Sequence, residues 1–435
     1  MNLEEKVFLA LKDLKNKIDI TQFDKRTLAR KIIENKEFSK ENIENLRKYI
    51  TYLLNDWEHY ENYYNNPDNT ANEEIEVQID KKTIKISATE YKEAIRKVKE
   101  LEEEKKQLKK QLEIYKDNYN SNEKILNYLK SVIKPEPLTT KAPKIEINKN
   151  KIEQVKVALI SDVHFDEVVK KEEIMGLNEY NQEVALKRLW KFLKATILIT
   201  ENDKKIFNIN QLNIFFLGDM ISGIIHDELI ETNETDVNTA IMTLSDVLSQ
   251  MIIIYTKYFN KIIVDCDFGN HGRINQKKTF KHRYVNFDTI LYNIIALRLK
   301  NYVDTGRIEI NVNLSPYGIR EILGWKFLHS HGDDVKSWNQ ISYYGLKRRY
   351  ANIKELYEKS GGFDYWVNAH THKPAYIEQT LTNGSVIGLN EYALAKFGNK
   401  APISQKFFGV NKEYGVNGVY DLQLQNAKEH NFKLR

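Results

Sequence analysis

The chain has 435 residues, 41% of them hydrophobic and 29% charged, which is typical of soluble globular proteins, and its net charge of +5 neither requires nor excludes a nucleic-acid partner. No apolar run approaches the roughly 18 residues of a membrane span, and the first residues lack the basic-then-apolar order of a signal peptide. The single cysteine, Cys266, excludes a disulfide framework. We therefore expect a cytoplasmic protein of about two or three domains with no membrane segment.

Residues 1–64 predict a small helical domain. Apolar residues recur at three- and four-residue spacing in 9–14, 27–33 and 43–54. Residues 39–42 have the composition of a helix N-cap with an acidic first turn. The segment 26–30, followed by a turn and another helix, resembles a helix-turn-helix. A module for helical packing or dimerisation is the alternative interpretation.

Residues 65–134 predict a small β-hairpin around residues 80–82 and then a short coiled coil. Residues spaced at alternating steps of three and four form a heptad seam: Tyr91, Ala94, Val98, Leu101, Lys105, Leu108, Leu112, Tyr115 and Tyr119. Such a seam favours a homo-oligomer that associates through this helix. The alternative is one amphipathic helix that packs on the chain's own core.

Residues 135–150 predict an extended linker, because residues 135–143 contain three of the chain's seven prolines. In 151–435, strands and helices alternate before the chain becomes rich in strands. The expected strands are 155–160, 213–217, 261–265, 308–314, 322–331, 365–369, 375–381, 386–389 and 419–424, and the expected helices are 181–199, 236–258 and 286–299. Asn383-Gly384 is typical of a hairpin turn. The order predicts an α/β fold of two stacked mixed β-sheets flanked by helices, preceded by an all-α region with a short coiled coil.

Five short segments rich in histidine and aspartate follow apolar runs in this second part. They are Asp162-Val163-His164, Gly218-Asp219, Gly269-Asn270-His271, His331-Gly332 and His370-Thr371-His372. The carboxyl ends of neighbouring parallel strands line one edge of a sheet, so side chains placed just beyond them can converge. The pattern therefore predicts a metal centre.

These segments resemble the motifs of the calcineurin-like metallophosphoesterase family, over roughly residues 153–390. The pattern is similar to that of phage and bacterial nuclease-like members. The resemblance implies two divalent metal ions with Asp219 as the bridging ligand. It implies that one ion is completed by Asp162, His164 and His372, and the other by Asn270, His331 and His370. Mixed imidazole and carboxylate ligands favour manganese, with iron, zinc or nickel as alternatives.

His271 is the candidate general acid, because it adjoins a ligand without being one in the motif and imidazole titrates near neutral pH. Arg273 follows it, and could either bind phosphate or hold the loop in an ion pair. His329 competes with His331 as the ligand of the fourth segment, and His331 is preferred because Gly332 follows it. His226 lies either at the substrate mouth or in a surface loop.

Two further departures from the motif are Ser222, where the family often has an aspartate, and Ala369 in place of a glycine. Basic and aromatic residues after the fourth segment could stack on bases and bind phosphates, or could form an ordinary amphipathic helix: Trp338, Tyr343, Tyr344, Lys347, Arg348, Arg349 and Tyr350.

The sequence thus predicts a metal-dependent hydrolase of phosphodiester bonds, and a nuclease acting on DNA is the first hypothesis. A protein or small-molecule phosphatase, or a cyclic-nucleotide phosphodiesterase, is the second, because the metals would act on the phosphoryl group alone. A DNA-binding or scaffold protein with a vestigial catalytic domain is the third.

Overall fold

The structure is a computed structural model of the chain. It describes residues 3–33, 38, 43–55, 57–58, 60–61, 74–79, 82–87, 93, 96–107, 109, 127–145, 147–225, 229, 232–274, 278–336, 342–398 and 401–434. The chain divides into two compact units, Met1–Asn118 and Tyr119–Arg435. Each unit is described by itself.

The first unit begins with helices α1 (Leu3–Lys17), α2 (Lys25–Ile33) and α3 (Ile43–Asn55), where the apolar spacing predicts helix. Their buried faces meet in one apolar core. The predicted cap at 39–42 lies outside the described residues. Strands β1 (Glu74–Ile79) and β2 (Lys82–Ser87) pair antiparallel in the expected hairpin, so the region before the linker is not all-α.

The predicted coiled coil is described over residue 93, residues 96–107 and residue 109, which are helical. Within this stretch the apolar seam residues Val98 and Leu101 are 51% and 56% exposed. The other apolar and aromatic seam positions lie outside the described residues. Two apolar side chains spaced three apart therefore face solvent on the described helix, and self-association stays a prediction.

The second unit is built on a six-stranded sheet with the order β13-β12-β3-β4-β5-β6. The strands are β3 (Glu153–Ile160), β4 (Asn208–Leu217), β5 (Lys261–Asp267), β6 (Ile308–Val312), β12 (Ser404–Asn411) and β13 (Gly415–Gln423). Strands β3 to β6 pair in parallel, whereas β12 runs antiparallel to β3 and to β13. The carboxyl ends of β3, β4 and β5 consequently reach one edge of the sheet.

A five-stranded mixed sheet with the order β10-β11-β9-β8-β7 packs against the first. Its strands are β7 (Gly318–Ile322), β8 (Trp325–His329), β9 (Tyr365–Asn368), β10 (Ala375–Ile377) and β11 (Thr380–Thr382). Leu159 and Phe215 from the first sheet share one core with Phe327 and Val367 from the second. Burial of these alternating apolar residues holds the two sheets face to face.

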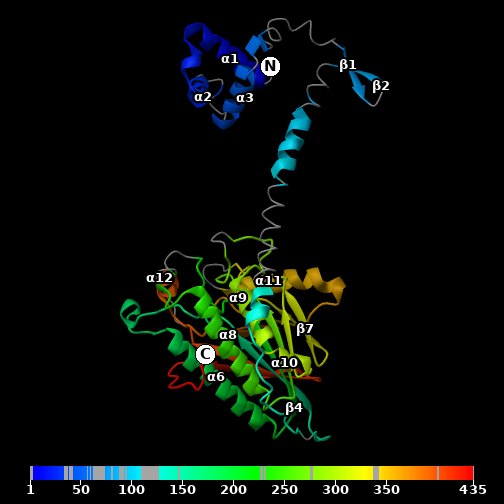
Figure 1. The fold of residues 1–435 in the computed structure, drawn as a ribbon, viewed down its shortest axis with the longest axis vertical. Helices are drawn as coiled ribbons and strands as arrows, with labels where there is room; N and C mark the ends of the chain where they lie inside the picture. Colours follow the sequence, from blue (N-terminus) through cyan, green and yellow to red (C-terminus); the bar gives the residue numbers. More distant parts are fainter. Residues whose placement is uncertain are drawn as a thin grey trace. The chain divides into compact units, whose positions relative to one another are not determined.

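Helices cover the outer faces of both sheets. The six-stranded sheet packs against α6 (Gln182–Asp203), α8 (Val237–Tyr255) and α9 (Phe287–Arg298), and α6 and α8 lie along one side of the unit (Figure 1). The five-stranded sheet packs against α11 (Ser342–Tyr357) through Leu346 and Ile353. The result is the predicted α/β fold, with two mixed sheets between layers of helix.

Helix α8 is long and apolar enough to cross a membrane by length and composition. It is the only such helix among the described residues, and 56% of its most apolar window is buried inside the fold. Leu244, Leu248 and Met251 on this helix belong to the main core. Its apolar character is thus accounted for by packing under the six-stranded sheet.

The predicted linker, residues 135–150, lies within the second unit, and its first half is bonded to residues near α9 and α10. The backbone N–H of Glu136 donates to the carbonyl of Arg298 at the end of α9, at 2.6 Å. Thr139 bonds to Tyr302, which lies in α10 (Lys300–Asp304), and the Thr140 carbonyl accepts from Arg307. These contacts fix residues 136–140 along the α9–α10 side of the domain.

Several predictions about strands differ from the structure. The strand expected at 322–331 begins later, as β8, because Ile322 ends β7 and the positive φ angles of Leu323 and Gly324 turn the chain. The strand expected at 375–381 is instead the β10–β11 hairpin, and residues 386–389, also expected as a strand, form none. Asn383-Gly384 is not a hairpin turn, since β10 and β11 already turn at residues 378–379. Strand β12 was not predicted, because its buried residues include Gln405 and Lys406.

Candidate metal centre

The strand ends bring the five predicted segments together. Asp162 and His164 follow β3, Asp219 follows β4, and Asn270 follows β5 in the six-stranded sheet, whereas His331 follows β8 and His370 and His372 follow β9 in the five-stranded sheet. Asp162, Asp219, His164 and His331 are all at most 3% exposed. The seven predicted ligands thus come from both sheets.

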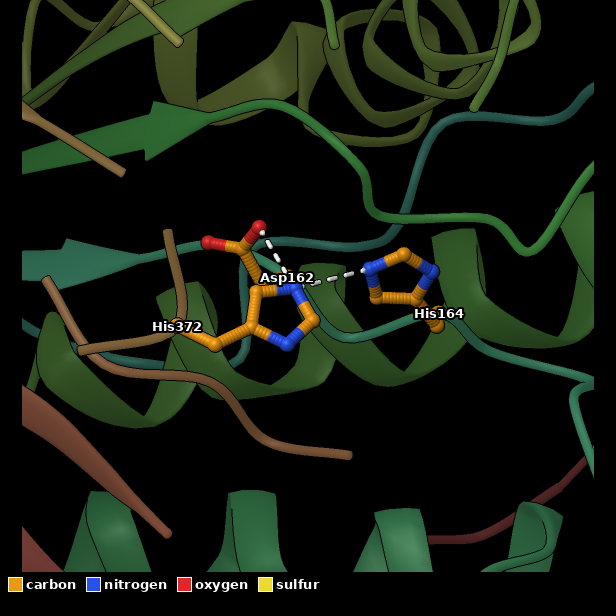
Figure 2. A group of neighbouring side chains, drawn as sticks. All are labelled: Asp162, His164 and His372. Atoms are coloured by element: carbon orange, nitrogen blue, oxygen red, sulfur yellow. Dashed lines mark hydrogen bonds and ion pairs between the residues drawn. The ribbon is translucent and has the colours of Figure 1, made fainter. Parts of the chain in front are cut away.

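Asp162, His164 and His372 form the first group of ligand atoms. Nε2 of His372 lies 3.3 Å from Nε2 of His164 and 3.2 Å from Oδ1 of Asp162. Figure 2 shows the two imidazole rings and the carboxylate turned toward one another. Two imidazole nitrogens and one carboxylate oxygen directed at a common point are a suitable donor set for a divalent transition metal.

Asp219, His331 and His370 form a second group, with Asn270 beside them. Nε2 of His331 lies 3.0 Å from Oδ2 of Asp219, 3.1 Å from Oδ1 of Asn270 and 3.2 Å from Nδ1 of His370. The two rings meet edge to face with centroids 5.0 Å apart. This group supplies two imidazoles, a carboxylate and a neutral amide oxygen.

Asp219 connects the two groups. It belongs to the second group and also to a third, in which ligand atoms of His164, Asp219 and His271 lie within 4.8 Å of one another. Asp219 is therefore near a ligand of each predicted ion. A carboxylate in this position has two oxygens with which to bridge a pair of metals.

The buried polar atoms fit a pair of divalent metals. Oδ1 of Asp162 is buried and makes no hydrogen bond in the described structure, although most buried polar atoms have a partner. A cation between Asp162, His164 and His372 would satisfy this oxygen and separate the two facing ring nitrogens. One ion would be held by Asp162, His164 and His372. The other would be held by Asn270, His331 and His370, and Asp219 would contribute to both.

Polar groups lie behind two of the imidazole ligands. Nδ1 of His331 bonds to the carbonyl oxygen of Leu217 at 2.7 Å, which leaves Nε2 facing the ligand group. Nδ1 of His164 makes no hydrogen bond to a described residue but lies 3.5 Å from Oε2 of Glu167, a buried residue whose Oε1 accepts from Asn390 at 2.7 Å. Such outer partners orient imidazole ligands and raise their basicity. The sequence did not indicate Glu167.

The charges of the cluster are strongly coupled. Burial opposes a charged imidazole, but the adjacent Asp219 carboxylate raises the pKa of His331 to about 10. Burial also lowers the pKa of His370 to about 4, with a further contribution from the His331 charge. The metal-free second group therefore holds a proton on His331 at neutral pH, and binding of a cation there must displace it.

Five of the seven predicted ligands have left-handed backbone conformations. The φ angles are 48° at Asp162, 46° at His164, 51° at Asp219, 71° at His370 and 56° at His372. Non-glycine residues rarely adopt positive φ, and each instance costs on the order of 1–3 kcal/mol. The turns that aim these side chains into the centre are therefore strained, which is common at functional sites.

Asp288 at the start of α9 ties two of these turns together, and the sequence did not indicate it. Its Oδ2 atom accepts from the backbone N–H groups of Asp219 and Gly269, both at 2.9 Å, and Oδ1 accepts from Met220 at 3.1 Å. Burial and the charge of Asp219 raise the pKa of Asp288 to about 7. Asn286, the N-cap of α9, bonds to the Gly269 carbonyl at 2.8 Å.

A buried polar network supports Asp162. The hydroxyl of Ser161 donates to Oδ2 of Asp162 at 2.7 Å and accepts from the Asn383 amide at 2.8 Å. Oε1 of Gln405 on β12 accepts from the same Asn383 amide and from the Ser161 backbone N–H, both at 2.9 Å. The predicted hairpin residue Asn383 thus has a supporting role beneath the centre.

His271 and Arg273 lie on the loop after β5. The backbone N–H of His271 donates to Oδ1 of Asp219 at 2.7 Å, and Nδ1 of its ring lies 3.1 Å from the Ser222 carbonyl. Nη1 of Arg273 donates to the Asn270 carbonyl at 3.3 Å, and its backbone pairs with Asn286. Arg273 thus contacts the ligand loop itself.

The structure brings His331, and not His329, to the ligand group. Nδ1 of His329 lies 2.8 Å from Oδ2 of Asp267, and the ring packs beside Phe215. The predicted role of His226 falls outside the described residues, as does Trp338. On α11, Tyr350 packs against Phe363, whereas Tyr343, Tyr344, Arg348 and Lys347 are exposed.

Gly269→Ala should abolish metal binding. A Cβ at this position would lie 2.1 Å from Oδ1 of Asp219 and 2.2 Å from its backbone nitrogen, so the carboxylate would have to move. Metal analysis of the purified variant checks this. Gly306→Ala is the control for a strained substitution away from the centre, because Gly306 has a φ of 75° but its Cβ would have no atom within 4 Å. Equal metal content in the two variants would contradict the tight approach of the two turns.

No protein-family profile and no curated protein matches the sequence. Solved structures of similar fold include an archaeal phosphodiesterase with 13% identity and a TM-score of 0.26, covering 61% of this chain and 99% of its own. A Streptococcus pneumoniae protein described as a predicted phosphoesterase has 8% identity and a TM-score of 0.24, covering 62% and 99%. Zinc-complexed Vps29 of Entamoeba histolytica has 11% identity and a TM-score of 0.23, covering 61% and 98%. The site itself therefore carries the case for a function.

Proposed function

We propose that the protein is a two-metal phosphodiesterase that hydrolyses nucleic acid, with DNA as the first candidate substrate. The observation that carries the proposal is the pair of ligand groups joined through Asp219. Two divalent ions in such a site supply charge to clamp a phosphoryl group and generate a nucleophile from water near neutral pH. Manganese remains the first choice of metal, because the donors are imidazole and carboxylate.

The protein residues then have separable tasks. Asp162 and Asp219 would supply the two negative charges of the ligand set. Asn270 would contribute an oxygen ligand without adding a third negative charge. His271 is held by Ser222 through Nδ1, so Nε2 is the nitrogen with which it can hand a proton to the departing oxygen. Arg273 lies two residues further along the same loop and would bind the phosphate or hold the loop in place.

A substrate panel tests the proposal. The manganese-loaded protein should hydrolyse bis-p-nitrophenyl phosphate, an activated diester, faster than the corresponding monoester. It should also cleave DNA more efficiently, per bond, than cyclic nucleotides. A preference for monoesters or phosphopeptides would establish the phosphatase alternative instead. Absence of hydrolysis with two metals bound would leave the scaffold hypothesis.

Self-association through the helix at 93–109 is a further part of the proposal, since two linked active sites could act on one polymer. Leu101→Asp should lower the mass measured by light scattering at micromolar concentration, because a charge at a heptad position opposes helix pairing. Lys99→Asp, also within the described helix but off the seam, is the control. A wild-type protein that is already monomeric would contradict the prediction.

A further inference from the structure

The segment between the turn after β5 and helix α9 is basic and contains no acidic residue. From residue 268 to residue 287 the sequence contains five Lys or Arg residues and no Asp or Glu: Arg273, Lys277, Lys278, Lys281 and Arg283. The described part, 278–285, is exposed at its tip, residues 278–282. We call residues 278–285 the basic loop. Its charge suits an anionic partner.

The tip of the basic loop presents an aromatic ring to solvent. Phe280 is 86% exposed, the highest value for a large hydrophobic side chain among the described residues. Its neighbours Thr279, Lys281 and His282 are exposed as well. An isolated exposed apolar residue needs no explanation by itself. An exposed phenylalanine followed directly by a lysine, Lys281, is, however, a combination that can stack on an unstacked base and contact its phosphate.

The basic loop is anchored beside the candidate metal centre. Arg283 donates two hydrogen bonds to the Asp333 carboxylate, at 2.7 and 2.8 Å, and Lys278 lies 2.8 Å from Oδ2 of the same residue. Asp333 is buried and lies two residues beyond His331. Arg283 also stacks over Phe268 at 5.5 Å. Both ends of the exposed tip are therefore fixed next to the strand end that carries a ligand.

The far side of the loop is fixed too. The backbone N–H of Phe287 donates to the Gly272 carbonyl at 2.6 Å, and Val285 bonds back to His282 at 3.0 Å. The loop thus leaves the turn that holds Asn270 and His271 and returns to it at the start of α9. A polymer held on Phe280 and Lys281 would pass close to the candidate metals.

We infer that the basic loop binds single-stranded nucleic acid, with Phe280 stacking on a base and Lys281 contacting phosphate. The inference rests on the proposed phosphodiesterase function and specifies its substrate. Single strands are favoured over duplex because a base must be unstacked to lie on the ring. Lys278 and Arg283 are paired with Asp333, so Lys281 is the exposed cation beside the ring that can contact a phosphate.

The test measures binding directly with full-length, manganese-loaded protein. The probe is a fluorescent phosphorothioate oligothymidylate, which resists cleavage and is longer than the about 4–16 nucleotides covered by one binding site. Phe280→Ala should weaken binding by about 5- to 150-fold, as expected for loss of one stacked base. Phe280→Trp should restore affinity. Lys281→Gln should reduce the slope of log affinity against log salt by about 0.7, one phosphate contact.

Tyr414→Ala is the matched control. Tyr414 is 70% exposed in the β12–β13 turn, and this turn lies at the opposite edge of the sheet because β12 runs antiparallel to β3. Equal losses for Phe280→Ala and Tyr414→Ala would overturn the inference, as would stronger binding of duplex than of single strands. Failure of the wild type to bind both oligothymidylate and oligouridylate would overturn it as well. A difference between these two oligomers would distinguish DNA from RNA.

Hydrolysis of bis-p-nitrophenyl phosphate separates this inference from the proposed function. The small diester needs the metal centre but has no neighbouring nucleotides for the loop to hold, so Phe280→Ala should leave its hydrolysis unchanged. A wild type that binds oligonucleotide without hydrolysing the diester would refute the proposed activity alone. Normal diester hydrolysis with no effect of Phe280→Ala on oligonucleotide binding would refute the loop assignment alone.

Discussion

Asp219→Asn should reduce bound metal from about two ions per chain to nearly none and bring phosphodiester hydrolysis to background. The side chain is buried between the two ligand groups, with Oδ2 3.0 Å from Nε2 of His331 and Oδ1 accepting from the His271 backbone. An amide keeps the shape but loses the charge and one of two oxygen donors. Elemental analysis after metal loading, followed by the diester assay, measures both losses.

Asp267→Asn is the matched control for this variant. Asp267 also ends a strand of the six-stranded sheet, is buried, and pairs with a histidine, His329, at 2.8 Å. It lies in none of the ligand groups of the described structure. Asp267→Asn should therefore retain two metals, whatever it does to stability. One retained ion in Asp219→Asn would show that the carboxylate does not bridge.

His271→Ala should slow hydrolysis of substrates with poor leaving groups by about 10²–10⁴, the usual contribution of a general acid, and should affect activated aryl esters much less. The residue's Nδ1 contact with the Ser222 carbonyl leaves Nε2 as the nitrogen available for proton donation. The measurement is the ratio of rates on an alkyl and an aryl phosphodiester. Equal losses on both would contradict the role.

Metal content decides between two roles for His271. Its ring packs edge to face on His164 with centroids 4.4 Å apart, and one of its nitrogens falls in a group with His164 and Asp219. A general acid leaves both ions in place when it is removed, whereas a ligand does not. His271→Ala with two ions and slow alkyl-ester hydrolysis would support the acid. Loss of an ion would make His271 a ligand.

Sequence patterns predicted the strands that carry the site because these strands are short and apolar. The runs before Asp162, Asp219 and Asn270 are β3, β4 and β5, and parallel pairing places their ends together. The predicted helices 181–199, 236–258 and 286–299 correspond to α6, α8 and α9 within a few residues. The local periodicity of apolar residues is sufficient to predict a helix or strand when burial of one face determines which element forms.

The supporting residues could not be predicted, because their partners are distant in sequence. Asn383 is 222 residues from Ser161, and Asp288 is 69 residues from Asp219. Each looks locally like something else: Asn383 precedes a glycine as in a hairpin turn, and Asp288 follows an N-cap as a helix-dipole partner. Buried polar residues contribute no periodic signal, which is also why β12 was missed.

The left-handed turns of the metal centre lower the stability of the folded protein. Each of Asp162, His164, Asp219, His370 and His372 holds a backbone conformation that glycine adopts at little cost. In a library selected for folding alone, glycine should accumulate at these five positions and at Asp166, whose φ is 92°. Under selection for hydrolysis the substitutions at the five ligand positions should vanish. Deep mutational scanning under the two selections would therefore identify the metal centre without any bound ion. Its positions are those where substitution by glycine is favoured by selection for folding and disfavoured by selection for hydrolysis.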